Sequence, residues 1–160
     1  MIKHLLLKNF VAFTDLDIDF TPGINIIIGE NGTGKTQLLK AILALCGPEA
    51  HRKQPGEQFA NKVCRLYQPL SGQLGGLRRA GMRGDAVLNA IFASGKEVAI
   101  RFNGIATEAK VSIGKGGDVA AATFIPTKEV LSLVRGLTAE QPDKPTIERI
   151  FDDGYLDLAR

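Results

Sequence analysis

Apolar and polar positions at the start of the chain follow the pattern of β-strands. Residues 2–9 mix apolar and basic side chains as a first strand would, and residues 16–20 alternate with period two. Thr21-Pro22-Gly23 is a turn signal. Residues 24–28 form a short apolar, β-branched run, which predicts a buried strand. We therefore expect two strands, a turn and a third strand before residue 29.

The next apolar positions have the character of a helix. Residues 37–45 predict a helix that ends at Gly47-Pro48, because glycine caps helices and proline cannot continue them. From residue 49 to residue 85 the pattern loosens, and glycine and polar residues become frequent. Within this basic, glycine-rich insertion the pattern indicates one strand, over residues 61–68.

The pattern sharpens again from residue 86 onward. Residues 87–93 and 97–102 are strand-like runs separated by a hairpin-type loop at residues 94–96. Asn103-Gly104 is a strong hairpin signal, and residues 105–113 would be the returning strand. A glycine-rich turn then leads into a strand-like run at residues 119–125. This order predicts an antiparallel meander and not a series of βαβ units.

Helical character follows after Pro126. Thr127 is placed to cap a helix over residues 128–137, and residues 141–145 have the composition of a linker. A further helical turn is predicted at residues 146–151. We expect residues 1–137 to form one lobe, with the basic insertion at about residues 49–85. Residues 138–160 would begin a truncated helical segment.

A glycine-rich loop lies between the third predicted strand and the first helix. Its sequence, GENGTGKT, matches the phosphate-binding pattern G-x-x-x-x-G-K-[ST] at every fixed position. Strand, glycine loop and helix in this order gather backbone N–H groups around a phosphate. Lys35 offers positive charge to the β- and γ-phosphates, and Thr36 offers a hydroxyl ligand to Mg²⁺. The predicted ligands are ATP and Mg²⁺, and the predicted binding residues are Gly29, Glu30, Asn31, Gly32, Thr33, Gly34, Lys35, Thr36 (also the metal ligand) and Gln37.

The residues around this loop resemble those of one branch of P-loop proteins. Phe10-Val11-Ala12-Phe13, the run at residues 16–20, Pro22-Gly23-Ile24-Asn25 and the loop itself are similar to the head domains of ABC-type ATPases of the AAA family, in the chromosome-maintenance, RecF and OLD-like group. Residues 124–132 resemble the point where such proteins enter their helical lobe. The resemblance implies an α/β fold: a P-loop NTPase N-terminal lobe with an antiparallel β-subdomain and a few helices.

The hydrolytic half of such a site does not emerge from the sequence. Hydrolysis in that group needs an apolar strand ending in Asp-Glu, and Ile150-Phe151-Asp152-Asp153 has only two apolar residues before its acids. Leu70-Ser71-Gly72-Gln73 resembles the ABC signature motif, but it precedes the antiparallel strands and is interpreted as a surface loop. The expected sensing glutamine near Phe124 is absent, and Val11 stands where the group often has an arginine near the base. The catalytic residues therefore remain unknown.

A basic cluster changes this picture in one respect. The segment between His51 and Asp85 contains seven basic residues and a single acid, Glu57, whereas the formal charge of the whole chain is only +3. They are Arg52, Lys53, Lys62, Arg65, Arg78, Arg79 and Arg83. The cluster fits either a contact surface for DNA or RNA through residues 52–83 or an ordinary solvated loop.

Composition excludes some environments. No apolar run approaches the roughly 20 residues of a membrane span. The N-terminus lacks a signal-peptide pattern, and Cys46 and Cys64 fit two free thiols, so we expect a cytoplasmic protein with no membrane partner.

Three functions fit the sequence. The first is an ATP-Mg²⁺-binding N-terminal half of an ABC-type ATPase, whose hydrolysis requires a second chain that supplies the missing motifs, or a homodimer. The second is a non-catalytic module in which bound nucleotide alters a partner surface. The third is a small-molecule kinase, which would need parallel strands after the first helix and is therefore disfavoured by the hairpin signals.

Overall fold

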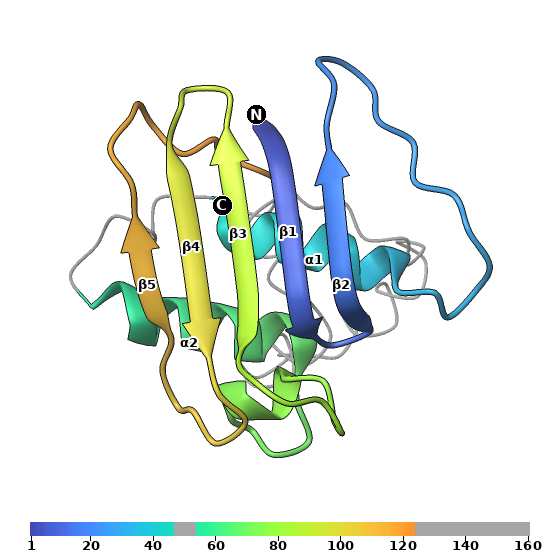
Figure 1. Ribbon diagram of the computed structural model, residues 1–160, viewed down its shortest axis with the longest axis vertical. Coiled ribbons are helices and arrows are strands. Elements are labelled where there is room, and N and C mark those ends of the chain that lie inside the picture. Colours follow the sequence, from blue (N-terminus) through green and yellow to red (C-terminus); the bar gives the residue numbers. More distant parts are fainter. Residues whose placement is uncertain (47–53, 124–160) are drawn as a thin grey trace, which may run out of the picture. The chain divides into compact units, whose positions relative to one another are not determined.

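Five strands form one antiparallel sheet in the computed structural model, which describes residues 1–46 and 54–123 (Figure 1). The strands are β1 (Ile2–Phe10), β2 (Phe13–Asp19), β3 (Ala86–Phe92), β4 (Glu97–Phe102) and β5 (Lys110–Ile113). Their order in the sheet is β2-β1-β3-β4-β5, and every neighbouring pair is antiparallel. The predicted antiparallel meander is therefore confirmed over β3, β4 and β5, with a tight β3–β4 hairpin in which the Phe92 amide donates to the Lys96 carbonyl.

Two α-helices lie against one face of this sheet (Figure 1). They are α1 (Lys35–Leu45) and α2 (Pro55–Tyr67), and a short 3₁₀-helix, η2 (Leu74–Leu77), follows them. The core between helices and sheet is apolar, with no buried polar or charged side chain among the described residues. Its largest fully buried side chains are Phe10, Phe92, Leu5, Leu7, Leu45, Leu66, Leu74, Leu88, Val63 and Val98. Burial of this apolar area stabilises the helix–sheet arrangement that carries the glycine loop.

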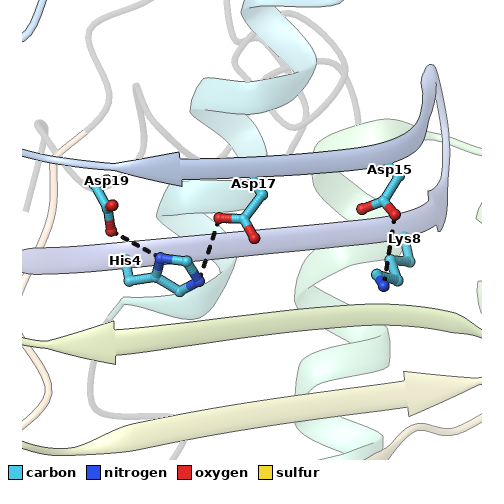
Figure 2. Close-up of polar contacts among 5 residues, drawn as sticks. All are labelled: His4, Lys8, Asp15, Asp17 and Asp19. Atoms are coloured by element: carbon cyan, nitrogen blue, oxygen red, sulfur yellow. Dashed lines mark hydrogen bonds and ion pairs between the residues drawn. The ribbon is translucent and has the colours of Figure 1, made fainter.

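The other face of the sheet is polar along its β1–β2 side. Figure 2 shows His4 between Asp17 and Asp19, with its two ring nitrogens 3.4 Å and 2.8 Å from the carboxylate oxygens. Lys8 lies 3.5 Å from Asp15. Exposed pairs of this kind contribute little stability, but they agree with the strand register, because a slip by one residue would turn these charges toward the core.

The insertion between residues 49 and 85 is more regular than its sequence suggests. The strand expected at residues 61–68 is wrong, because α2 occupies this segment. Phe59, Ala60, Val63 and Leu66 are buried at helical spacing on one side of α2, and Pro55 occupies its first turn, where a missing N–H does not interrupt hydrogen bonding. A helix with one apolar side covers the β4–β5 half of the sheet.

The strand expected at residues 24–28 is also wrong for the described structure. This segment carries no strand pairing there, and Ile24, Ile26 and Ile28 are 90%, 78% and 88% exposed. A strand that is apolar on both faces needs neighbouring strands and cover on each side. Residues 1–46 and 54–123 do not supply them.

The remaining expectations had mixed outcomes. The first helix ends at Leu45, just before the predicted stop. The returning strand is β5, which is shorter than the predicted 105–113, and residues 119–123 form no strand. The helix at residues 128–137, the linker, the helical turn at 146–151 and the boundary at residue 137 lie outside the described residues. In the described part of the chain, no helix is both long and apolar enough to cross a membrane.

Candidate nucleotide-binding site

The glycine loop ends in a left-handed residue that starts α1. Gly34 is the N-cap of this helix, with φ 95° and ψ 12°, and Gly32 has φ 84°. A Cβ atom at Gly34 would lie 3.1 Å from the Ala12 Cβ and 3.2 Å from the Phe13 ring. Glycine is therefore favoured at position 34 both by the backbone angle and by the crowding that a Cβ atom would meet.

The first turn of α1 presents backbone donors at the end of this loop. The Leu38 amide is the first to donate within the helix, to the Gly34 carbonyl at 2.8 Å. The preceding amides, from Gly34 to Gln37, are those that a helix leaves without partners inside itself. Residues 29–33 and Thr36 are exposed, so a ligand can reach the loop. An exposed loop, a helix N-terminus and a close-packed glycine fit a phosphate group.

Lys35 folds back over the start of the loop. Its Nζ donates to the Gly29 carbonyl at 2.7 Å and to the Glu30 carbonyl at 2.6 Å. The Glu30 carbonyl also accepts a hydrogen bond from the Thr33 hydroxyl at 2.9 Å. These contacts close the loop into a compact ring with the lysine charge beside it, which suits an anionic ligand.

The nine predicted binding residues are contiguous, and the structure gives one of them an additional role. The Gln37 side chain accepts a hydrogen bond from the Ala12 amide at 3.1 Å, so it holds the turn between β1 and β2. Gln37 remains a predicted ligand residue only through its amide. Its carbonyl accepts a hydrogen bond from the Tyr67 hydroxyl at 2.5 Å, which ties α2 to the first turn of α1.

Tyr67 is a supporting residue that the sequence does not reveal. Its ring packs edge-on against Phe10, with the centroids 5.3 Å apart, and burial raises the pKa of its hydroxyl above the usual 10.0. The contact with Gln37 joins residues 30 positions apart, so no local pattern could have indicated it.

Replacing Tyr67 with phenylalanine is expected to lower the free energy of unfolding by about 1 kcal/mol at neutral pH, because one buried hydrogen bond is lost. The folded-state pKa is raised, so the wild type loses stability as pH rises above the unfolded value of about 10, where only the unfolded phenol ionises. Urea denaturation at pH 7 and pH 10.5 tests this. The gap between wild type and variant should shrink at the higher pH, and a constant gap contradicts the assignment.

Some side chains of the basic cluster donate hydrogen bonds to backbone carbonyls of the same chain. Arg78 donates to the Met82 and Gly84 carbonyls, and Arg79 donates to the Val11 and Ala12 carbonyls. The Lys62 Nζ donates to the Cys46 carbonyl at 2.9 Å. Arg52 and Lys53 lie outside the described residues. At least three of the seven cations therefore serve the fold, which weakens the interpretation of the cluster as one nucleic-acid surface.

Two other expectations are met. Residues 70–73 form an exposed turn, in which the Gly72 amide donates to the Pro69 carbonyl at 2.8 Å. Cys46 and Cys64 are free thiols, and burial raises the pKa of each. Among the residues the structure describes, no group of histidine, cysteine and acidic side chains is arranged to hold a metal ion. Within the glycine loop, the predicted metal ligand is the hydroxyl of Thr36, which is exposed.

An antiparallel sheet, a glycine loop and a helix that begins at a lysine and a threonine define a lobe of a P-loop NTPase. The family model described as an AAA domain matches residues 4–126, and the chain belongs to this family of P-loop ATPases. This confirms the resemblance to the RecF group and the α/β fold class.

Curated relatives are similar over most of this chain but extend well beyond it. A DNA replication and repair protein RecF from Halalkalibacterium halodurans is 31% identical over 155 residues, which are 97% of this chain and 37% of the relative. A protein of the same name from Listeria welshimeri is 29% identical over 135 residues, which are 84% of this chain and 34% of the relative. The chain thus spans about a third of the length of these relatives.

Proposed function

We propose that the chain binds ATP with Mg²⁺ and acts as one half of an ABC-type ATPase, with hydrolysis dependent on groups from a second half. The glycine loop carries the first part of this proposal. Amides of residues 32–36 would surround the β- and α-phosphates, Lys35 would neutralise charge on the β- and γ-phosphates, and Thr36 would place a hydroxyl on the metal. Bound Mg²⁺ would supply charge neutralisation at the phosphates.

The exposed isoleucines before the loop support the need for a second half. Ile24, Ile26 and Ile28 lie directly before the loop on a segment without strand pairing and are 90%, 78% and 88% exposed, whereas Ile27 is half-buried. In a paired strand, alternate residues would point to opposite sides, so Ile24, Ile26 and Ile28 would share one apolar side, with Asn25 and Ile27 on the other. Such a segment is stable when strands and helices cover it, and large exposed apolar patches mark interaction surfaces. A second half that pairs with this segment would also stand next to the phosphates.

Phosphate release tests the dependence on a second half. The chain alone should bind ATP and release phosphate no faster than buffer. A mixture with a polypeptide that carries an Asp-Glu strand and a signature helix, taken from a neighbouring reading frame, should turn over. Replacing Ile26 with aspartate should abolish turnover in the mixture but leave ATP affinity unchanged. Rapid phosphate release by the chain alone contradicts the proposal.

The relatives suggest the setting of this activity. Proteins named for DNA replication and repair match most of this chain, so the bound nucleotide would act in a transaction on DNA. Contact with DNA or RNA through residues 52–83 remains part of the proposal, on the basic character of this segment in the sequence. A homodimer is the alternative source of the second half. ATP binding that never leads to turnover, in any mixture, would favour the nucleotide-responsive regulatory module instead.

A further inference from the structure

The turn between β1 and β2 has a strained backbone. Val11 in this turn has φ 47°, and Asn9, next to the end of β1, has φ 50°. Positive φ is rare for residues other than glycine, and it is an outlier for a β-branched residue such as valine, whose side chain crowds the backbone there. Backbone strain of this kind persists only where the surrounding structure enforces it, and it is concentrated at functional sites. The surroundings of Val11 therefore show what the strain serves.

The end of η2 and the two residues after it enforce this conformation. The Val11 amide donates to the Leu77 carbonyl at 2.9 Å, and the Arg79 amide donates to the Asn9 carbonyl at 2.8 Å. The Arg79 guanidinium then crosses the turn, and its Nη1 donates to the carbonyls of both Val11 (3.3 Å) and Ala12. One charged side chain thus holds two successive carbonyls of the strained segment, with the strength of charge-assisted hydrogen bonds.

The far side of the same turn contacts the glycine loop. The Ala12 amide donates to the Gln37 side chain at 3.1 Å. The Ala12 Cβ and the Phe13 ring would crowd a Cβ atom at Gly34, the left-handed N-cap of α1. The turn therefore packs against the residues whose amides would bind phosphate.

We propose that Arg79 is a positioning residue for nucleotide binding. It touches no part of the ligand site. It holds residues 9–12 in their strained form, and this turn keeps Gly34 and Gln37 in place, so that the loop amides are preorganised for phosphate. The inference rests on the proposed binding of ATP at the glycine loop. It also assigns a function to an arginine that the sequence suggested as a nucleic-acid contact.

The neighbouring arginine provides a matched control. Arg78 also donates through Nη1 to two carbonyls, but these belong to Met82 and Gly84 in its own loop. Arg78→Gln and Arg79→Gln remove the same charge and the same kind of bond. They differ in whether the lost bonds reach the turn beside the glycine loop.

The test compares ATP affinity in the two variants, by displacement of a fluorescent ATP analogue, at a temperature where circular dichroism shows both to be folded. Arg79→Gln should weaken ATP binding about tenfold, the lower end of the range known for residues that orient the ligands of a metal site. Arg78→Gln should bind ATP as tightly as wild type, because the bonds that it loses lie within its own loop. In spectra of protein labelled with ¹⁵N-glycine, the Gly34 amide should shift in Arg79→Gln and not in Arg78→Gln. If Arg79→Gln does not fold, Arg79→Lys, which can retain one of the two bonds, takes its place with a smaller loss.

A second substitution separates positioning from simple destabilisation. Glycine adopts φ near 47° without strain, so Val11→Gly removes the need for an enforcing side chain. Val11→Gly should therefore restore most of the affinity lost in Arg79→Gln. Equal affinities for the two arginine variants, or no recovery with Val11→Gly, would overturn the inference while leaving ATP binding intact. Failure of the wild type to bind ATP would overturn the proposed function and this inference with it.

Discussion

Replacing Lys35 with alanine should lower the affinity of the chain for ATP by about a hundredfold. Hydrogen bonds to charged groups contribute roughly 1.5–3 kcal/mol each, and about 1.4 kcal/mol corresponds to a tenfold change in affinity. Lys35 is the cation closest to the loop, with its Nζ within 2.7 Å of the Gly29 and Glu30 carbonyls. Equilibrium titration with a fluorescent ATP analogue, in the presence of Mg²⁺, measures the loss.

A control variant distinguishes this effect from a general change in charge. Lys115 is an exposed lysine after β5, and Lys115→Ala removes the same charge from the chain. Its ATP affinity should equal that of wild type. Thr36→Ala should retain binding without Mg²⁺ but lose the additional affinity that Mg²⁺ confers. Unchanged ATP affinity in Lys35→Ala would show that the glycine loop does not bind the phosphates of ATP.

Replacing Phe10 with alanine should destabilise the fold by about 3–5 kcal/mol, the range for a large buried aromatic side chain. Phe10 is fully buried at the end of β1. Its ring packs edge-on against Tyr67 and Phe102, with centroid distances of 5.3 Å and 6.2 Å. It thus joins the sheet to α2 directly beside the β1–β2 turn. The expected result is a large decrease in the urea midpoint with an unchanged slope.

Ile91 provides the comparison for Phe10. It lies on the open face of the sheet and is 37% exposed. Ile91→Ala should therefore lower the free energy of unfolding by much less than Phe10→Ala does. Similar midpoints for the two variants would show that the helices do not pack on the sheet as described.

Local patterns in the sequence were sufficient where one segment determines its own structure. Alternation predicted β1 and β2, and the hairpin signals at residues 94–96 and 103–104 predicted the antiparallel order of β3, β4 and β5. The glycine loop and the start of α1 followed from a motif whose residues are contiguous. In these cases the side-chain period or a turn preference carries the information.

Prediction failed where distant segments decide the outcome. Residues 61–67 are helical because Val63 and Leu66 are buried against the apolar face of the sheet in that conformation. Residues 24–28 have a strand sequence, yet the described residues leave them unpaired. Tertiary context overrides local preference in both cases.

The same limit applies to the candidate site. Arg79 contacts the Val11 and Ala12 carbonyls across 68 and 67 residues of sequence, and the sequence alone suggested a surface cation. Positive φ at Val11 is likewise invisible in a sequence, because valine rarely adopts it.

Hydrogen exchange of the glycine loop tests the central claim most directly. Peptides covering Gly29 to Gln37 should exchange their amides more slowly when ATP and Mg²⁺ are added, because phosphate oxygens would accept hydrogen bonds from the loop. Peptides from β4 (Glu97–Phe102), on the other half of the sheet, should be unaffected. Slower exchange confined to the loop and the contacting β1–β2 turn is the predicted result. Unchanged exchange at residues 29–37 at saturating ATP would contradict nucleotide binding at this site.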